Sequence, residues 1–214
     1  MKNRNCLIHA LFIPFVCISC IISPKQDMIA NYESKQLEIS QLYEYVCEIT
    51  TEDKYFSIEF ESNEKITYFF VAIEHMDTLT GNSYTTNIVA DGNYDKGFIS
   101  NRDLDVDSQN VDNLLSKLGW TRNELKTLKQ NLDNANCISI ESEEHLKIGS
   151  LGKVRDPMTI GYKRAGMGKY SYKIFNQALS GSLKSKYNDG CKYIFYKDNI
   201  VLQYSGGVIG PQCF

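Results

Sequence analysis

Three times along the chain, two runs rich in β-branched and aromatic residues are separated by a short turn. These pairs of runs lie at residues 54–75, 159–175 and 191–207. In the third pair, alternating strands flank Asp198-Asn199, and both residue types accept the positive φ of a tight hairpin turn. Such pairs predict β-hairpins and therefore an antiparallel sheet. Residues 85–90 are a weaker strand candidate.

Helical patterns lie between the predicted hairpins. Residues 108–134 place leucines at helical spacing in two successive stretches. Gly119 is typical of the end of a helix, and Thr121 with Glu124 forms a capping box that begins the next one. We expect Trp120, which lies between the two helices, to fill their junction.

Two further segments have helical spacing. Residues 33–48 place apolar side chains on one side of a helix behind acidic residues, and residues 177–190 predict a short helix. The order of helix, strands, paired helices and strands predicts an α+β fold. We expect an antiparallel sheet built from hairpins, with a few helices packed on one face. No repeat or low-complexity linker divides residues 35–214, so they are expected to form a single domain.

The N-terminal residues have the pattern of a secretory signal. Basic residues precede an apolar stretch from Cys6 to Cys20, and a polar stretch follows from Ser23. A positive region, a short apolar region and a small residue before a cut site are typical of a signal peptide. The alternative is an uncleaved anchor helix, but the stretch is at the lower limit of length for spanning a membrane and contains Pro14.

The segment Cys17-Ile18-Ser19-Cys20 resembles the lipobox of bacterial lipoproteins, in which a small residue precedes the cysteine that is lipidated. It differs in having Cys17 where lipoboxes usually have Leu. The resemblance covers this segment alone. It implies a signal peptide over residues 1–19, a lipidated Cys20, and a tether over residues 20–34. Cysteine suits this chemistry because its thiolate is the nucleophile.

This resemblance also implies where the protein is found and what it touches. We expect a cell-envelope protein whose N-terminal acyl chains hold it to the membrane, in the outer membrane if the host is Gram-negative. The net charge is −3, and like charges form no long block. This composition provides no electrostatic footprint for nucleic acid or for an anionic membrane surface, and nucleic acid is therefore not an expected partner.

Four cysteines lie beyond the lipobox: Cys47, Cys137, Cys191 and Cys213. In an oxidising envelope they allow three pairings, among which the sequence does not choose. Cys191 opens a predicted hairpin and Cys213 lies just past its end, so these two could meet. Cys47 and Cys137 would then pair by elimination. The alternative is that the cysteines are buried thiols, since cysteine is among the most buried residue types.

Acidic residues recur at two-residue spacing in two places. Oxygen ligands at positions 1, 3 and 5 of a turn converge on a hard cation. The candidate calcium ligands are Asp91, Asn93, Asp95, Asp103, Asp105 and Asp107. Both runs lack the Gly and the final Glu of a calcium loop, and no other cofactor is expected. The alternative is a polar turn for the first run and, for the second, acids gathered at the start of a helix.

Catalytic motifs are missing from the sequence. It contains no G-x-S-x-G or H-E-x-x-H, and His75 and His145 lie in no motif with mechanical meaning. We therefore predict no catalytic residues.

Tyrosines crowd the C-terminal strands. They are Tyr162, Tyr170, Tyr172, Tyr193, Tyr196 and Tyr204. Alternation along strands would place about half of them on a solvent face, where tyrosine is a good contact residue for protein or sugar. The alternative is that they pack in the core.

These observations favour a non-enzymatic binding or interaction module in the envelope, such as an immunity-like protein or an accessory subunit with a protein partner. The alternative is an envelope hydrolase that acts on glycan or peptide. A concave site with convergent carboxylates or a histidine would favour the enzyme, and a flat or tyrosine-lined face would favour binding.

Overall fold

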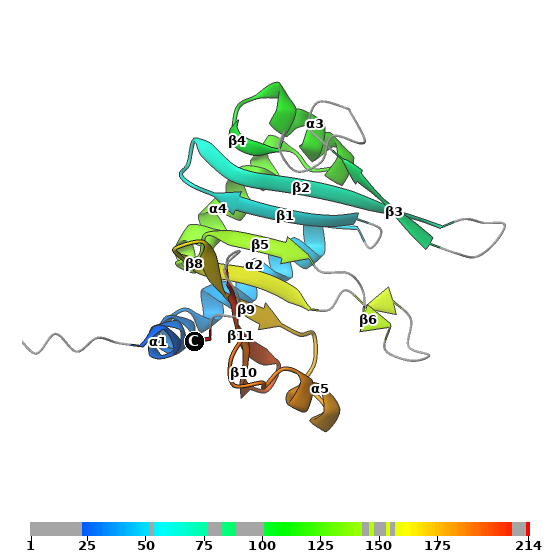
Figure 1. Cartoon of the computed structure of the whole chain (residues 1–214). Helices are drawn as coiled ribbons and strands as arrows, with labels where there is room; N and C mark the ends of the chain where they lie inside the picture. The colour runs from blue at the N-terminus through cyan, green and yellow to red at the C-terminus, as the bar shows by residue number, and fades with distance from the viewer. Residues whose placement is uncertain are drawn as a thin grey trace, which may run out of the picture.

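The computed structural model describes residues 23–51, 54–76, 83–88, 101–142, 146–147, 153–154, 157–206 and 213–214. Within these ranges the predicted α+β fold is confirmed (Figure 1). The lipobox and Cys20 lie outside the described residues, as do Asp91, Asn93 and Asp95.

In the part of the chain that the structure describes, nine strands form one sheet in the order β10-β11-β9-β8-β5-β1-β2-β3, with β4 also beside β2. They are β1 (Lys54–Phe60), β2 (Lys65–Met76), β3 (Ser83–Ile88), β4 (Arg102–Asp105), β5 (Ser139–Ser142), β8 (Met158–Ala165), β9 (Gly168–Ile174), β10 (Tyr193–Lys197) and β11 (Ile200–Ser205). A second, two-stranded sheet joins β6 (Leu146–Lys147) to β7 (Lys153–Val154). All of these pairings are antiparallel.

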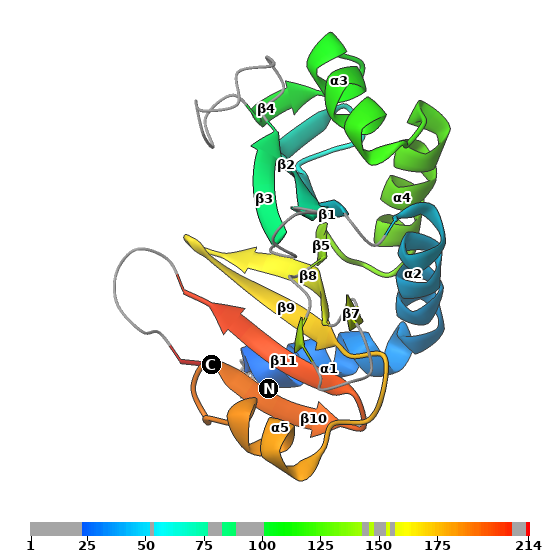
Figure 2. The same cartoon turned by 90° about the vertical axis from the view of Figure 1, so that its right-hand side faces the viewer.

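The helices are α1 (Pro24–Ser34), α2 (Gln36–Ile49), α3 (Gln109–Leu118), α4 (Arg122–Asn134) and α5 (Gly181–Lys186). Figure 2 shows α2 and α4 side by side along the sheet, and the short α5 beside β10 at one end of the molecule. Among the described helices, none has both the length and the apolar character needed to cross a membrane.

Local signals place the turns and helix ends where the sequence predicts them. Asp198 has a φ of 45° in the β10–β11 turn, and Gly119 has a φ of 77° where it ends α3. Thr121 and Glu124 form the predicted capping box of α4. A hairpin therefore closes one edge of the sheet, and a tight turn sets α4 against α3.

Trp120 fills the junction of α3 and α4, as predicted. Its Nε1–H donates a hydrogen bond of 2.8 Å to the carbonyl oxygen of Ile49, at the end of α2. Its ring meets Phe56 of β1 edge to face, with 4.8 Å between centroids. The indole therefore joins the helical layer to the centre of the sheet.

The expected tether over residues 20–34 is wrong from residue 24 onward, because α1 occupies Pro24–Ser34. The Ser23 side chain accepts a hydrogen bond from the Gln26 backbone N–H and caps this helix. Met28 is fully buried, and Tyr32 is buried as well. Burying these side chains stabilises the helix on the sheet, so residues 24–34 are part of the folded body.

Candidate functional site

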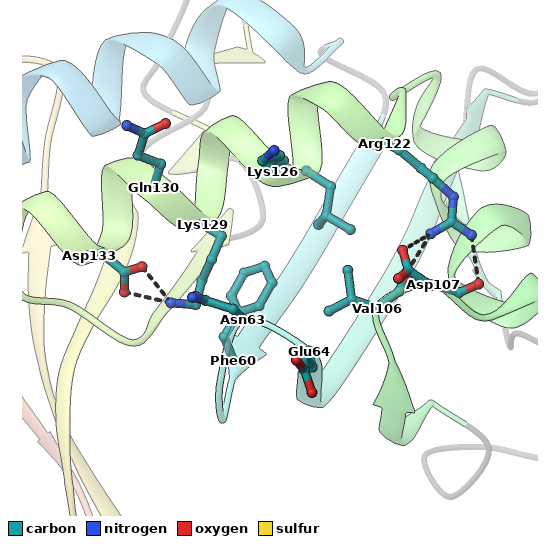
Figure 3. A pocket seen from close by; sticks show the side chains of 11 residues that line it. Phe60, Asn63, Glu64, Val106, Asp107, Arg122, Lys126, Lys129, Gln130 and Asp133 are labelled. Atoms are coloured by element: carbon teal, nitrogen blue, oxygen red, sulfur yellow. Dashed lines mark hydrogen bonds and ion pairs between the residues drawn. The ribbon is translucent and has the colours of Figure 1, made fainter.

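A groove lies between α4 and the turn that joins β1 to β2 (Figure 3). Its volume is about 480 Å³, within the range of small-ligand pockets. The lining residues are Phe60, Asn63, Glu64, Val106, Asp107, Arg122, Leu125, Lys126, Lys129, Gln130 and Asp133.

The floor of the groove is apolar. Phe60 ends β1, Leu125 belongs to the buried leucine stripe of α4, and Val106 follows β4. The backbone N–H of Val106 donates a hydrogen bond of 3.0 Å to the carbonyl oxygen of Glu64, which fixes the two loops to each other. An apolar side chain that entered the groove would pack against this floor and bury the remaining exposed surface of Val106, since Phe60 and Leu125 are already buried.

Arg122 holds one end of the groove in place. Its Nη1 donates to the Val106 carbonyl oxygen at 2.8 Å and to Asp107 Oδ1 at 3.0 Å. Its Nε lies 2.8 Å from Asp112 Oδ1, and that hydrogen bond raises the pKa of the guanidinium. Arg122 therefore orders the segment that precedes α3 and is engaged by the protein's own carboxylates.

Lys129 closes the other end. Its Nζ donates hydrogen bonds of 2.6 and 2.7 Å to the two carboxylate oxygens of Asp133, one helical turn further along α4. The same ammonium lies 5.8 Å from the centroid of the Phe60 ring. A cation beside an aromatic ring is favourable, so this end is also preorganised.

Two charged side chains of the groove are exposed and form no ion pair with the described residues. Lys126 and Glu64 are both exposed. Among the described residues, neither the Lys126 ammonium nor the Glu64 carboxylate forms an ion pair. The groove therefore offers an apolar floor with one available cation and one available anion at its rim.

The geometry suits binding better than proton transfer. Figure 3 shows Asp107 and Asp133 at opposite ends of the groove, each joined to its own cation. A pair of carboxylates that share a substrate would have to converge on one point. No histidine is among the lining residues.

The predicted tyrosine surface is corrected by the burial of its members. Tyr162, Tyr170, Tyr172 and Tyr204 are buried, whereas Tyr193 and Tyr196 are half-buried. The strands β8 and β9 contain runs of consecutive buried residues, which means that both faces of the sheet are covered there. Neighbouring positions along these strands point to opposite faces of the sheet, but both faces are covered, so a tyrosine on either face is kept from solvent.

The structure chooses among the cysteine pairings. Cys191 and Cys213 form a disulfide, as the sequence suggested. The pairing of Cys47 with Cys137 is wrong, because Cys47 is an exposed thiol on α2 and Cys137 is a buried thiol after α4. Burial raises the pKa of Cys137 to about 12.

The carboxylates of the second acidic run pair with different cations. Asp105 Oδ1 lies 2.5 Å from Lys65 Nζ, whereas Asp107 pairs with Arg122. Asp103 has a φ of 53° at the start of β4. Because these carboxylates turn toward different cations, they do not converge, and no group of three or more metal-ligating side chains occurs within the described residues.

The groove was not predicted from the sequence. The Thr121–Glu124 capping box marked α4, but the opposite wall comes from residues 60–64 and 106–107, which are distant in sequence. The side chains of His75 and His145 lie outside the described residues.

The fold and the groove together define an α+β protein with an antiparallel sheet and a groove of ligand size. No family model matches the chain, and no curated protein or solved structure matches it.

Proposed function

We propose that this chain is an envelope-anchored lipoprotein whose body is a non-enzymatic binding module for a protein partner, either immunity-like or an accessory subunit. The observation that supports this proposal is the groove beside α4. Its ends are held by internal ion pairs, and its floor is apolar.

The chemistry of the groove indicates what part of a partner it would hold. A single apolar side chain fits against Phe60, Val106 and Leu125, and a neighbouring carboxylate would pair with the exposed ammonium of Lys126. We therefore propose that the partner presents an exposed segment with an apolar residue beside an acidic one. Preorganised walls favour such binding because these side chains lose little conformational entropy on association.

An envelope hydrolase acting on glycan or peptide is the second proposal, and it has less support. The groove carboxylates Asp107 and Asp133 are engaged by Arg122 and Lys129, and they lie apart. A carboxylate that serves as the acid or nucleophile of a hydrolase must be able to face the substrate.

The test is affinity capture with residues 23–214 on beads, exposed to envelope extract and analysed by mass spectrometry. This segment contains every residue of the two hydrophobic cores, so we expect it to fold. Lys126→Glu reverses the charge at the groove rim, and Lys117→Glu makes the same change on the exposed face of α3, outside the groove.

A protein that is recovered with the native chain and with Lys117→Glu, but not with Lys126→Glu, supports the proposal. Equal recovery with all three chains would show that the groove is not the binding site. If nothing is recovered, the protein-partner proposal fails and hydrolase screens follow.

A further inference from the structure

Three exposed lysines lie over aromatic rings at the end of the molecule that carries α5 and β10. The Nζ atoms of Lys184, Lys186 and Lys192 lie 4.9, 5.2 and 5.1 Å from the ring centroids of Phe195, Tyr187 and Tyr193, respectively. We call the three lysines, together with the half-buried rings of Tyr193 and Phe195, the α5–β10 surface. The Tyr187 ring is buried beneath it. Within the described residues, none of the three lysines forms an ion pair.

The surface rests on a rigid support. Phe175, Leu179, Tyr187 and Val201 form a small hydrophobic core beneath it. The Cys191–Cys213 disulfide holds the start of β10. The lysines and rings are therefore presented by ordered backbone.

The backbone of β10 is not offered to a partner strand. Asp189 Oδ1 accepts the backbone N–H groups of Cys191 and Tyr193 at 2.8 Å each. Asn188 Oδ1 accepts the N–H of Phe195 at 3.2 Å. Because these side chains satisfy donors of the edge strand, strand addition at this edge is disfavoured. A partner of this surface must meet its side chains.

The charge of this part of the chain is opposite to that of the whole. Residues 173–206 hold five lysines and two aspartates, so this stretch has a net charge of +3, whereas the complete chain has a net charge of −3. Lys197 is paired with Glu33 at 2.9 Å. The unpaired positive charge is therefore concentrated on Lys184, Lys186 and Lys192, and it attracts anions.

The N-terminal helix ties this end of the molecule to the expected lipid anchor. Figures 1 and 2 place α1, β10 and α5 at the end opposite α3. The cap of α1, Ser23, lies three residues after Cys20 in the sequence. At about 3.5 Å per residue, these three residues reach about 10 Å. If Cys20 is lipidated, this end of the body cannot move far from the membrane surface.

We propose that the α5–β10 surface lies on the anionic phosphate headgroups of a membrane. Lysine ammonium groups pair with lipid phosphates, and tyrosine and phenylalanine rings are favourable at the boundary between headgroups and acyl chains. The surface is on a different part of the molecule from the groove, so the two proposals can fail independently.

The test is co-sedimentation of residues 23–214, without the lipid, with vesicles of phosphatidylcholine alone or mixed with phosphatidylglycerol. Each lysine close to an anionic surface strengthens binding about fivefold. We expect binding to the anionic vesicles at low salt and release at high salt, because salt screens the attraction. Equal binding to both kinds of vesicle, or none to either, would overturn the proposal.

Charge reversals locate the surface. The double variant Lys184→Glu/Lys186→Glu should weaken binding to anionic vesicles about 25-fold or more. Lys192→Glu should weaken it about fivefold or more. Lys117→Glu on α3 has the same change in net charge as Lys192→Glu and should retain more of the binding. Equal loss with these two single variants would show that net charge alone is responsible, which would contradict the proposed surface.

Competition with inorganic phosphate shows whether the surface binds lipid headgroups or free phosphate ions. At matched ionic strength, we expect phosphate and chloride to release the protein from anionic vesicles equally. Specific release by phosphate would indicate a site for single phosphate ions and would overturn the membrane proposal.

Discussion

The phenolic hydroxyl of Tyr172 in β9 donates a hydrogen bond of 2.8 Å to the carbonyl oxygen of Met28 in α1. The phenolic oxygen of Tyr172 in turn accepts a hydrogen bond of 3.1 Å from Asn31 Nδ2. Tyr172 is fully buried, and burial raises the pKa of its hydroxyl, which therefore remains a donor. The contact joins the first helix of the folded body to a central part of the sheet.

Replacing Tyr172 with Phe should lower the free energy of unfolding by about 1–3 kcal/mol, because the buried Met28 carbonyl and Asn31 amide lose a partner. Urea denaturation followed by circular dichroism measures the change. The matched control is Tyr193→Phe, because the Tyr193 hydroxyl forms no hydrogen bond with the described residues. Equal stability of the two variants would show that the hydroxyl of Tyr172 contributes nothing measurable.

The ion pair between Asp27 of α1 and Lys163 of β8 should make stability depend on pH. The hydrogen bond from Lys163 lowers the pKa of Asp27, and the hydrogen bond to Asp27 raises the pKa of Lys163. The Asp27 contribution is present above its unfolded pKa of about 3.8 and is lost as pH falls through the lower folded value. The Lys163 contribution is present below about 10.5 and is lost as pH rises through the higher folded value.

Asp27→Asn should therefore lower stability at pH 7 by about 0.5–1 kcal/mol, a small amount because solvent screens this partly exposed pair. The deficit relative to the native chain should shrink as pH falls below about 4. Chemical denaturation across this range measures it, with Glu44→Gln on the exposed face of α2 as the control for loss of one negative charge. A deficit that stays constant with pH would contradict the assignment.

The hairpins and the paired helices could be predicted from sequence because their signals are local. Asp198 in a turn, Gly119 at a helix end, and Thr121 with Glu124 each act within a few residues. The signal for α1 was local as well. Ser23 and Gln26 form a capping box, with a proline in the first helical turn. A tether was expected because the segment is polar, although its capping box and proline indicate the start of a helix.

The rest depends on contacts between distant segments. Whether Tyr170 or Tyr172 reaches solvent is decided by the layers that cover the sheet, and α1 precedes both by more than a hundred residues. Phe60 and Val106 form the opposite wall of the groove beside α4, and the sequence of α4 does not indicate which residues pack there. Spacing along one strand or helix holds no information about such partners.

Cys47 and Cys137 should react very differently with alkylating reagents. Cys47 is exposed, whereas Cys137 is buried and its pKa is raised to about 12, so its reactive thiolate is scarce at pH 8. Mass spectrometry of residues 23–214 after brief iodoacetamide treatment should find a label on Cys47 alone. A label on Cys137 at the same rate would contradict its burial. Unfolding in urea without reductant should expose it and add the second label.

The Cys191–Cys213 disulfide should be a large contributor to stability. It joins residues 22 apart in sequence, and loop-closure entropy predicts about 3 kcal/mol for a loop of this length. It also holds Phe214, whose ring lies 5.6 Å from that of Tyr170. Denaturation of Cys191→Ser/Cys213→Ser should give a free energy of unfolding lower by about this amount. Cys47→Ser is the control, because it removes an exposed thiol that forms no disulfide. If the double variant and this control unfold at the same urea concentration, the bridge contributes nothing measurable to stability, which would contradict the prediction.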